Sequence, residues 1–448
     1  MTTHYQIVVL GGGESGVGAA LLAKKHGIKV LVSDSGKIPE KYRSVLINND
    51  IDFEEDGHTI ASILNAEEII KSPGIPERVK IIREARLKSI PIISEIEFAS
   101  RYTDAKLIFI TGSNGKTTTT LLTHYILKTS GLNVGLAGNI GDSFAKQVAT
   151  RDYDYYVLEI SSFQLDGMYN VHPHIAILLN ITPDHLDRYD YNFEKYAQSK
   201  FRITQNQSNK DAFIYNMDDP VISGMINNAG IKARMFPISL KKTDLEMGAF
   251  LKEEEITIID NKTSIKMTLE QLALQGKHNA YNSMAAGVAA KLMDIRRSTL
   301  KQCLSDFHNV AHRLEYVSSV HGISFINDSK ATNVNSTWYA LEFYNKPIIW
   351  IAGGQDKGND YTMLKDLVKE KVKAIVCLGK DNDTIHNEFG DIIETIVDTD
   401  TANNAVNAAY LLAKKGDVVL LSPACASFDL FESYEDRGDQ FKDAVKNL

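Results

Sequence analysis

Residues 106–122 read KLIFITGSNGKTTTTLL, and this stretch decides the class of the fold. An apolar run from Leu107 to Ile110 predicts a buried strand, and the segment after Thr117 has the character of a helix. The glycines between them let backbone N–H groups close around phosphate oxygens, at the positive end of the new helix. Lys116 supplies a charge for β- and γ-phosphates, and Thr117 supplies a hydroxyl for Mg²⁺. The stretch therefore predicts a nucleotide loop, against the alternative of an ordinary Gly-rich turn between a strand and a helix.

The bulk composition describes an ordinary globular chain. The sequence has 448 residues, of which 44% are hydrophobic and 24% charged, enough for roughly three domains. A net charge of −8 argues against nucleic acid as a partner. No run approaches the ~20 apolar residues of a membrane span, and the N-terminus lacks the features of a signal peptide. Three widely spaced cysteines, Cys303, Cys377 and Cys425, fit a reducing cytoplasm. We expect a cytoplasmic monomer that binds neither nucleic acid nor membrane.

Three blocks of sequence alternate short apolar runs with amphipathic segments, the rhythm of parallel sheets with crossover helices. We expect a three-domain α/β protein with a Rossmann-like first domain, a P-loop-type central domain and a Rossmann-like third domain. The predicted boundaries are 1–100, 101–309 and 310–448. The runs that predict strands are 6–10, 29–34, 67–74 and 90–94 in the first block, 154–161 and 174–181 in the second, and GISFIND, KPIIWIAGG, KAIVCLG and DVVLLSP in the third.

Part of the second block departs from this rhythm. Residues 231–275 are mixed, charged and strand-like, with a turn signal at Asp260-Asn261, and they predict an antiparallel region attached to the domain. A helix of small residues follows from Asn279 to Leu292. Asn279 and Asn282 near its start have two interpretations, as helix caps or as ligand contacts.

A second glycine cluster lies near the N-terminus. Gly11, Gly13 and Gly16 follow the first predicted strand, and Asp34 closes the next, as in a dinucleotide-binding fingerprint. Tight packing of strand against helix is the alternative reading. An NAD-dependent oxidoreductase would be the first guess, but the complete nucleotide loop in the next block already accounts for an energy source.

Polar side chains also end the apolar strands of the second block, where ligands bind in parallel sheets. They are Asn139 in GNIG, Glu159 in YYVLEISSFQL with Gln164 after it, and Asp184, His185 and Asp187. Mg²⁺ bound to ATP needs few protein ligands because it keeps several waters. A carboxylate and an imidazole near the phosphates suffice. Lys200, in FEKYAQSKFRI, reads by periodicity alone as a solvated helical lysine.

The loop variant G-S-N-G-K-T-T resembles the nucleotide loop of the Mur ligases, the ATP-dependent amino-acid-adding enzymes of peptidoglycan synthesis. The ELSSFQ-like and N-x-x-x-D-H-x-D segments, together with the S-P-G turn at 72–74, carry the same resemblance, which extends in order over essentially the whole chain. It implies cofactors ATP and Mg²⁺, a first domain that holds the uridine diphosphate of a UDP-sugar, and an acyl-phosphate intermediate.

The resemblance also implies roles for individual residues. The residues expected at ATP are Gly112, Ser113, Asn114, Gly115, Lys116, Thr117, Thr118, Asn279, Asn282, Arg313 and Asp328. Those expected at the UDP substrate are Ser15, Asp34, Ser35, Ser72, Asn139, Gln164 and His185. The implied metal ligands are Thr117, Glu159, His185 and Lys200, with Lys200 as a carbamate, because an ammonium cannot ligate a metal. The implied catalytic residues are Lys116, Lys200, His185 and Glu159.

The third block resembles the D-glutamate-adding branch of this family. GGQDKG (353–358) and LSPACASFDLFESYEDRG (421–438) carry this likeness, and no D-N-P-R motif of the lysine- or diaminopimelate-adding branch occurs. The residues implied at D-glutamate are Thr332, Lys357, Ser427 and Tyr434, the last where a Phe is common. The implied substrates are UDP-N-acetylmuramoyl-L-alanine and D-glutamate. Two alternatives stay open, a ligase like folylpolyglutamate synthase and a P-loop NTPase switch.

Overall fold

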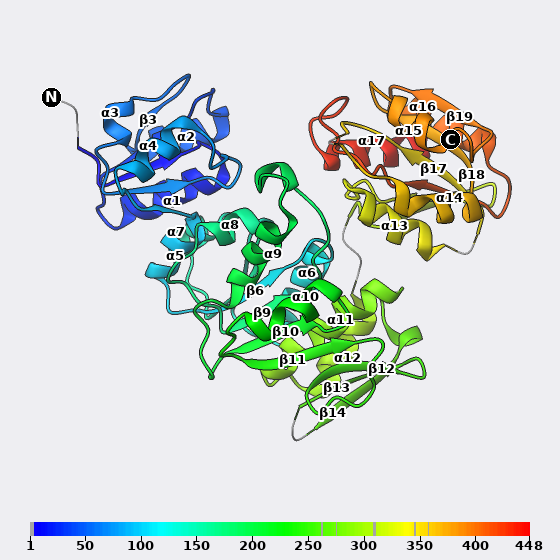
Figure 1. Ribbon diagram of the computed structural model, residues 1–448, viewed down its shortest axis with the longest axis horizontal. Helices are drawn as coiled ribbons and strands as arrows, with labels where there is room; N and C mark the ends of the chain where they lie inside the picture. The colour runs from blue at the N-terminus through cyan, green and yellow to red at the C-terminus, as the bar shows by residue number, and fades with distance from the viewer. Residues whose placement is uncertain (1–3, 261–262, 275, 308–310, 345, 357) are drawn as a thin grey trace. The chain divides into compact units, whose positions relative to one another are not determined.

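The computed structural model describes residues 4–448 except 261–262, 275, 308–310, 345 and 357. It contains three sheets, each with helices against its faces (Figure 1). The chain divides into two compact units, Met1–Phe307 and His308–Leu448, so the first two sheets share a unit and the third has its own. The three-domain α/β fold with mostly parallel sheets, predicted from the alternating pattern, is confirmed.

The first sheet has five parallel strands in the order β3-β2-β1-β4-β5. Its strands are β1 (Ile7–Leu10), β2 (Val30–Ser33), β3 (Asp52–Glu54), β4 (Glu68–Lys71) and β5 (Ile92–Ile93). The helices of this part are α1 (Glu14–Lys25), α2 (Glu40–Asn48), α3 (Ile60–Ile63), α4 (Lys80–Leu87) and α5 (Glu95–Ala99). Strand β3 has no counterpart in the sequence prediction, because its three residues are largely polar and only partly buried.

The central sheet has nine strands in the order β14-β13-β12-β11-β10-β9-β6-β8-β7. They are β6 (Lys106–Thr111), β7 (Val134–Gly138), β8 (Tyr155–Glu159), β9 (Ile175–Leu178), β10 (Ala212–Asn216), β11 (Arg234–Ser239), β12 (Gly248–Lys252), β13 (Glu255–Ile259) and β14 (Ser264–Thr268). The antiparallel prediction for 231–275 holds for β12–β14. It is wrong for β11, which pairs parallel with both of its neighbours. Asn261 of the predicted turn lies outside the described residues.

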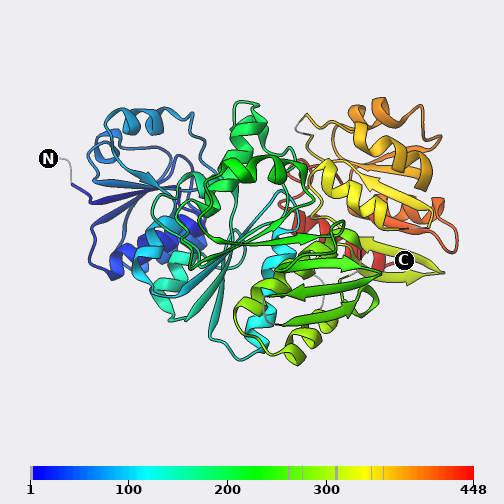
Figure 2. The same cartoon turned by 60° about the horizontal axis from the view of Figure 1, so that its bottom comes forward.

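Helices cover both faces of the central sheet. They are α6 (Lys116–Thr129), α7 (Phe144–Thr150), α8 (Ser162–Asp166), α9 (Phe193–Phe201), α10 (Pro220–Met225), α11 (Lys277–Leu292) and α12 (Arg297–Asp306). On one face, α6, α11 and α12 pack together over a core that includes Ile110 and Met284 (Figure 2). On the other face, α7 packs against α1 of the first sheet, and one apolar cluster runs through both. The first two sheets are therefore joined by a shared core.

The third sheet has six strands in the order β15-β16-β20-β17-β18-β19, and β15 alone pairs antiparallel among the described pairings. The strands are β15 (Glu315–Val320), β16 (Ile323–Asn327), β17 (Ile348–Ala352), β18 (Val372–Leu378), β19 (Ile396–Thr399) and β20 (Val418–Leu421). The helices are α13 (Val334–Phe343), α14 (Lys365–Lys371), α15 (Asp383–Phe389), α16 (Ala402–Leu412) and α17 (Tyr434–Lys446). Short 3₁₀ turns complete the chain, among them η1 (Ser100–Tyr102), η2 (Leu186–Arg188), η3 (Arg202–Thr204), η4 (Ile226–Asn228), η5 (Leu269–Gln271) and η6 (Thr362–Leu364).

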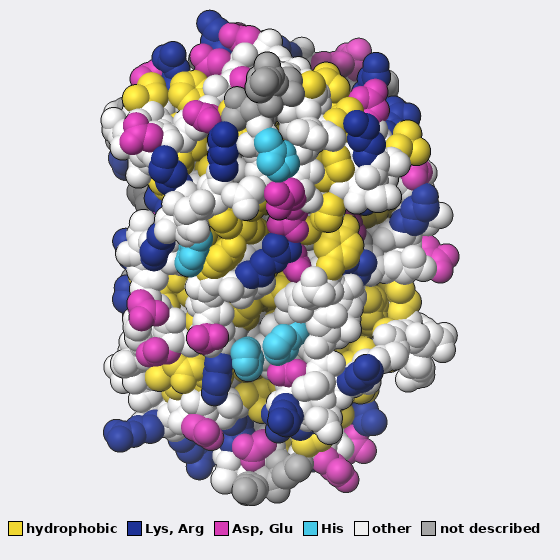
Figure 3. Space-filling view, turned by 90° about the vertical axis from the view of Figure 1, so that its left-hand side faces the viewer, with side chains coloured by type: hydrophobic (Ala, Val, Ile, Leu, Met, Phe, Trp, Pro, Cys, Tyr) yellow, Lys and Arg dark blue, Asp and Glu magenta, His cyan; other side chains and the backbone are white. Residues whose placement is uncertain are grey.

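Burial and surface charge follow the expected pattern. The central strands of the three sheets, such as β1, β9 and β17, are apolar and buried, because helices cover both faces. Over the face drawn in Figure 3, basic and acidic side chains are interspersed. Among the helices of the described ranges, none combines the length and the apolar character that crossing a bilayer requires.

Candidate active site

The nucleotide loop lies between β6 and α6, as the sequence predicts. Gly112 (φ +156°) and Gly115 (φ +80°) hold left-handed backbone conformations at the two ends of the loop. A Cβ on Gly115 would lie 2.4 Å from Asn282 Oδ1, so only glycine fits there. Asn180, directly after β9, fixes the loop from outside, since its Oδ1 accepts from Asn114 N (2.8 Å) and its Nδ2 donates to Asn114 O (3.1 Å). Residue-by-residue reading of the sequence missed this role of Asn180, although it ends a strongly apolar strand.

Two lysines converge on this loop. Lys116 Nζ donates to the carbonyl oxygens of Gly112 and Ser113, both at 2.8 Å. Lys200 Nζ, from α9, donates to the same Gly112 oxygen at 2.9 Å and lies over the Tyr196 ring. Lys200 is only 2% exposed, so its reading as a solvated helical lysine is wrong. Burial, together with the Lys116 charge, holds the pKa of Lys200 well below its usual range.

Glu159 presents a carboxylate oxygen at the same edge of the sheet. It ends β8, is 2% exposed, and its Oε1 accepts from Asn139 Nδ2 at 2.9 Å. Its Oε2 is buried and has no hydrogen-bond partner within the described part of the chain. Burying a carboxylate oxygen without a partner costs folding free energy, and a bound cation would be a suitable partner. The charges of Glu159 and Asp184 both act on Lys200, so the three side chains are neighbours.

His185 lies in the turn before η2. Its backbone is left-handed (φ +52°) and its side chain is 45% exposed. Its Nε2 is 3.7 Å from Asp184 Oδ2, and its ring contacts the Phe163 ring edge-on with the centroids 5.2 Å apart. Exposure leaves this imidazole accessible to a ligand or a metal.

Asn279 and Asn282 lie beside the nucleotide loop, and the interpretation of both as helix caps is wrong. Helix α11 begins at Lys277 after Gly276, which places the two asparagines inside the helix. Asn282 Nδ2 donates to Asn279 Oδ1 (3.0 Å), and Asn282 Oδ1 accepts from Thr119 Oγ1 (3.1 Å). They connect α11 to α6 just behind Gly115. Gln164, in contrast, does cap a helix, because its Oε1 accepts from Ser161 N at 2.9 Å. The contact of Gln164 with the UDP substrate stays a prediction.

The N-terminal glycine cluster forms a tight loop after β1. A Cβ on Gly16 would lie 1.9 Å from Gly11 O, so α1 packs closely on the strand end. Asp34, at the end of β2, closes the loop, since its Oδ2 accepts from Gly12 N at 2.6 Å and its Oδ1 from Gly36 N at 2.9 Å. The predicted substrate residues of this part gather at the carboxyl edge of the sheet, after β1, β2 and β4. They are Ser15, Asp34, Ser35 and Ser72.

Arg188 connects the two sheets of this unit, and sequence reasoning missed it. From η2, its guanidinium donates to the carbonyl oxygens of Pro73 (3.1 Å), Gly74 (3.2 Å) and Ile75 (3.2 Å). It also lies 4.2 Å from the centroid of the Phe163 ring. One cation thus clamps the S-P-G turn of the first sheet to the loop that carries His185. The only sequence signal for Arg188 is its place at the end of the D-H-L-D-R segment (184–188). By itself, an arginine at such a position is interpreted as a surface charge.

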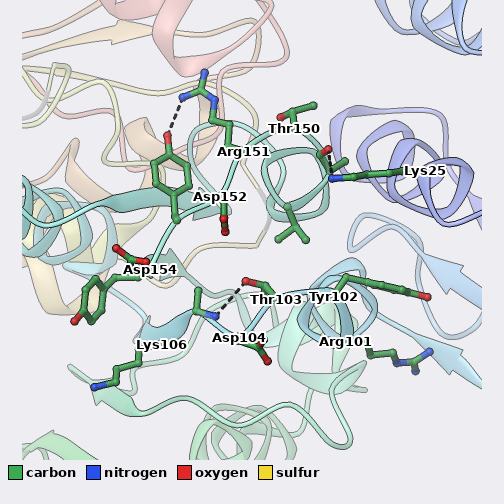
Figure 4. A pocket seen from close by; sticks show the side chains of 15 residues that line it. Lys25, Arg101, Tyr102, Thr103, Asp104, Lys106, Thr150, Arg151, Asp152 and Asp154 are labelled. Carbon is green, nitrogen blue, oxygen red and sulfur yellow. Dashed lines mark hydrogen bonds between the residues drawn. The ribbon is translucent and has the colours of Figure 1, made fainter.

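A cleft of about 900 Å³ lies at the opposite, amino-terminal edge of the central strands (Figure 4). Its walls carry both signs of charge, with Lys25, Arg101 and Lys106 among acids such as Asp152 and Asp154. Lys25 Nζ is already bonded to Ala149 O at 2.8 Å. This cleft contains none of the predicted site residues, which lie at the other edge of the sheet.

The second unit holds the remaining predicted residues. Asp328 is buried, and its oxygens accept from Leu314 N (3.1 Å) and Ser422 Oγ (2.9 Å). Burial raises the pKa of its carboxyl to about 7. These bonds give Asp328 an internal role, so its contact with ribose stays a prediction. Arg313 and Thr332 flank the same strand end, Thr332 with its side chain exposed. Lys357 lies outside the described residues.

Ser427 lies in the loop after β20, and Tyr434 is the first residue of α17. Tyr434 Oη accepts a hydrogen bond from Lys330 Nζ at 3.0 Å. The hydroxyl that distinguishes Tyr434 from the more common Phe therefore makes a contact inside the protein. Ser427 is buried. Arg437, which the sequence analysis did not single out, is fully buried and donates to Ser329 Oγ, Ser329 O and Cys425 O. It fixes the two loops that carry the predicted D-glutamate residues relative to each other.

The fold and the site define the class of this protein. Models of three Mur ligase parts match in order: a MurD-like N-terminal domain (residues 5–94), the Mur ligase middle domain (110–290) and the Mur ligase glutamate ligase domain (312–425). The chain belongs to the Mur ligase family.

Comparison with individual proteins shows which members of the family the chain is similar to. The chain is 55% identical over 445 residues to the UDP-N-acetylmuramoylalanine–D-glutamate ligase of Porphyromonas gingivalis W83, covering 99% of both chains. It is 54% identical over 444 residues to the enzyme of that name from Bacteroides fragilis, covering 99% of this chain and 100% of the relative. Among solved structures, UDP-N-acetylmuramate-alanine ligase MurC from Thermotoga maritima shares the fold, with a TM-score of 0.63 at 17% identity over 99% of this chain and 100% of MurC.

Proposed function

We propose that this chain joins D-glutamate to UDP-N-acetylmuramoyl-L-alanine, with hydrolysis of ATP, in peptidoglycan synthesis. Relatives more than half identical over the whole chain bear the name of this activity. The structural observation that carries the proposal is the convergence of Lys116 and Lys200 on Gly112 O, beside the unpartnered oxygen of Glu159. The charge of Lys116 and the unpartnered oxygen of Glu159, which could bind Mg²⁺, suit the transfer of a phosphoryl group.

The reaction needs an activated acyl group, because a carboxylate is a poor electrophile. The terminal carboxylate of the UDP substrate attacks the γ-phosphorus of ATP, and ADP leaves. The resulting acyl phosphate is attacked by the amine of D-glutamate, and inorganic phosphate leaves from the tetrahedral intermediate. Lys116 is placed to stabilise charge on the transferring phosphoryl group, which is most of what such a transfer requires.

The residues proposed to hold Mg²⁺ fit a hard cation. Glu159 offers an unpartnered buried oxygen, Thr117 a hydroxyl at the start of α6, and His185 an accessible imidazole. Bound Mg²⁺ would neutralise part of the phosphate charge. We assign the ATP loop to Gly112–Thr118, with Asn279 and Asn282 on its adenine side.

Lys200 is proposed to act as a carbamate. An amine reacts with CO₂ only when it is unprotonated, and burial beside Lys116 favours that form of Lys200. The carbamate would supply an anionic oxygen for Mg²⁺ where an ammonium supplies none.

The D-glutamate residues are proposed to be Thr332, Lys357, Ser427 and Tyr434, with Arg313 and Asp328 at the nucleotide. A lysine and hydroxyls suit a dicarboxylate. We further propose a cytoplasmic monomer. Its three cysteines are free and buried, as a reducing compartment would leave them.

The two alternatives are less well supported. A folylpolyglutamate synthase-like ligase would not need a first domain whose S-P-G turn is clamped by Arg188, and relatives of high identity bear a different name. A P-loop switch would hydrolyse ATP without either substrate.

Phosphate release measured with ATP-Mg²⁺ and each substrate omitted in turn tests the proposal. We expect release only when UDP-N-acetylmuramoyl-L-alanine and D-glutamate are both present. Release without them would support a switch, and release with a folate in place of the UDP substrate would support the other ligase.

A further inference from the structure

Three side chains with metal-ligating atoms meet in the second unit, apart from the predicted D-glutamate and nucleotide residues. They are Cys377 in β18, His386 in α15 and Asp398 in β19. Their sulfur, nitrogen and oxygen atoms all lie within 4.8 Å of one another. His386 Nε2 is 3.0 Å and 3.1 Å from the two Asp398 oxygens. From this geometry we infer a binding site for Zn²⁺ or a chemically similar transition-metal ion, with Cys377, His386 and Asp398 as its ligands.

The fold itself brings these residues together. Cys377 and Asp398 are direct partners in the parallel pairing of β18 with β19, so their side chains lie on the same face of the sheet. Helix α15 covers that face, where its Ile385 and Phe389 share an apolar cluster with Cys377. His386, on the same helix, is thereby held over the two strand residues.

The donor set favours a borderline-soft ion. A sulfur, an imidazole and one carboxylate suit Zn²⁺, whereas Mg²⁺ and Ca²⁺ prefer oxygen ligands throughout. The donor atoms lie at most 4.8 Å apart, and His386 Nε2 is 3.0–3.1 Å from the Asp398 oxygens. Two ligands on a tetrahedral Zn²⁺ are separated by ~3.3–3.8 Å, so binding needs a rearrangement of at most about 1.5 Å. The side chains of His386 (40% exposed) and Asp398 (58% exposed) have the freedom to make it, while Cys377 is buried and fixed.

An open cleft gives an ion access and leaves a position for water. A cleft of about 850 Å³ lies beside His386 and Asp398, and its charged lining is mostly acidic. The charged residues are Lys380, Asp381, Asp383, Asp398 and Asp400. Three protein ligands with one open position are a common zinc arrangement. Asn382 Nδ2 donates to Asp398 Oδ1 at 3.0 Å, as an outer partner that orients a ligand would.

The competing explanation is a hydrogen-bonded trio that binds no metal. Burial and the neighbouring Asp398 raise the pKa of the Cys377 thiol, so an ion must displace its proton. Titration with Co²⁺ separates the two explanations, because a thiolate bound to Co²⁺ gives a charge-transfer absorption that oxygen and nitrogen ligands do not give. The full-length protein is stripped with chelator and titrated with Co²⁺ in excess Mg²⁺, which occupies oxygen-only sites.

We expect the band to saturate at one equivalent and to vanish when Zn²⁺ is added. Cys377→Ser should abolish it, whereas Cys303→Ser, at a buried cysteine in the other unit, should keep it. His386→Gln and Asp398→Asn, at partly exposed positions, should weaken Co²⁺ binding by more than the ~10–100-fold that loss of an outer partner causes. No band in the wild type, a band retained by Cys377→Ser, or unchanged affinity in both other variants would overturn the site. Thermal melting of each variant checks that it is folded.

Discussion

The side-chain nitrogens of Lys116 and Lys200 share one acceptor, the carbonyl oxygen of Gly112, at 2.8 Å and 2.9 Å. Residues 84 positions apart (200 − 116) therefore place two amines at the first residue of the nucleotide loop. Lys200 is fully buried, whereas Lys116 is half-buried. Burial and the charge of Lys116 therefore lower the pKa of Lys200. This arrangement assigns different tasks to the two lysines, and the first two predictions test them.

Lys116→Ala should abolish ligation and leave binding of UDP-N-acetylmuramoyl-L-alanine nearly unchanged. The charge of Lys116 serves ATP phosphates at the central sheet, whereas the uridine side belongs to the first sheet. Loss of one transition-state charge contact typically costs ~10²–10³ in rate. Ligation assays and calorimetric binding of the UDP substrate measure the two effects. Near-normal turnover would contradict the assignment of this loop.

Lys200→Ala should remove most activity, and added short-chain carboxylic acids should restore part of it. A small acid can enter the space left by the side chain and supply the oxygen that the carbamate would supply. Lys200→Arg is the matched control, since a guanidinium fills the space and cannot ligate a metal. Activity is assayed with and without acetate. Equal rates for the wild type and Lys200→Ala would show that the buried amine has only a packing role.

Arg188→Ala should raise the KM for the UDP substrate by about 10-fold or more, with little change in the KM for D-glutamate. Its guanidinium holds three carbonyl oxygens of the turn at 73–75, and a bond to a charged group contributes ~1.5–3 kcal/mol. Arg188→Lys keeps the charge but cannot reach all three acceptors, so it should fall between the wild type and the alanine variant. An unchanged KM for the UDP substrate would reduce Arg188 to a surface contact.

Lys357→Ala should weaken D-glutamate selectively, with a rise in its KM of about 10- to 150-fold if binding equilibrates before chemistry. D-glutamate carries two carboxylates, and Lys357 belongs to the Gly-rich sequence GGQDKG that follows β17 along the chain. Ser427→Ala should shift KM less, because its hydroxyl is neutral. Steady-state kinetics with each substrate varied in turn provide the measurement. A higher KM for ATP alone would instead assign this loop to the nucleotide.

Glu95→Gln should flatten the dependence of stability on pH. Burial raises the pKa of Glu95 from 4.5 to about 7, and its Oε1 accepts from Ser143 Oγ (2.9 Å) and Ala145 N (2.5 Å). Between these pKa values the folded chain binds a proton that the unfolded chain has released, so stability falls as pH rises through this window. The loss is up to about 3 kcal/mol above pH 7.

Glutamine keeps the accepting oxygen and cannot ionise, so its variant should lose less stability between pH 5 and pH 8. Urea unfolding of the N-terminal unit at both pH values measures the difference. Glu40→Gln, at an exposed site on α2, serves as the control and should behave as the wild type. A pH profile of Glu95→Gln that matches the wild type would show that this carboxyl ionises at its ordinary pKa.

The nucleotide loop, the α/β pattern and the family can be predicted from the amino-acid sequence alone. These features are local, since a run of apolar residues favours a buried strand and a glycine before Lys116 permits the left-handed turn wherever they lie in the fold. The strand predictions at 6–10, at 174–181 and in KPIIWIAGG (346–354) agree with β1, β9 and β17 for this reason. The short, polar β3 and the parallel pairing of β11 gave no such local signal.

Contacts between residues far apart in the sequence depend on how the helices and strands pack together. The periodicity of α9 predicts that Lys200 is a solvent-exposed helical lysine. Packing of that helix against the nucleotide loop instead buries Lys200, and its Nζ donates to Gly112 O. The same holds for Arg188 at the S-P-G turn and for Cys377 beside Asp398. Sequence patterns indicate on which face of its own helix or strand a side chain lies. Which partner it meets depends on strand order and helix packing, which are set by burial over the whole domain.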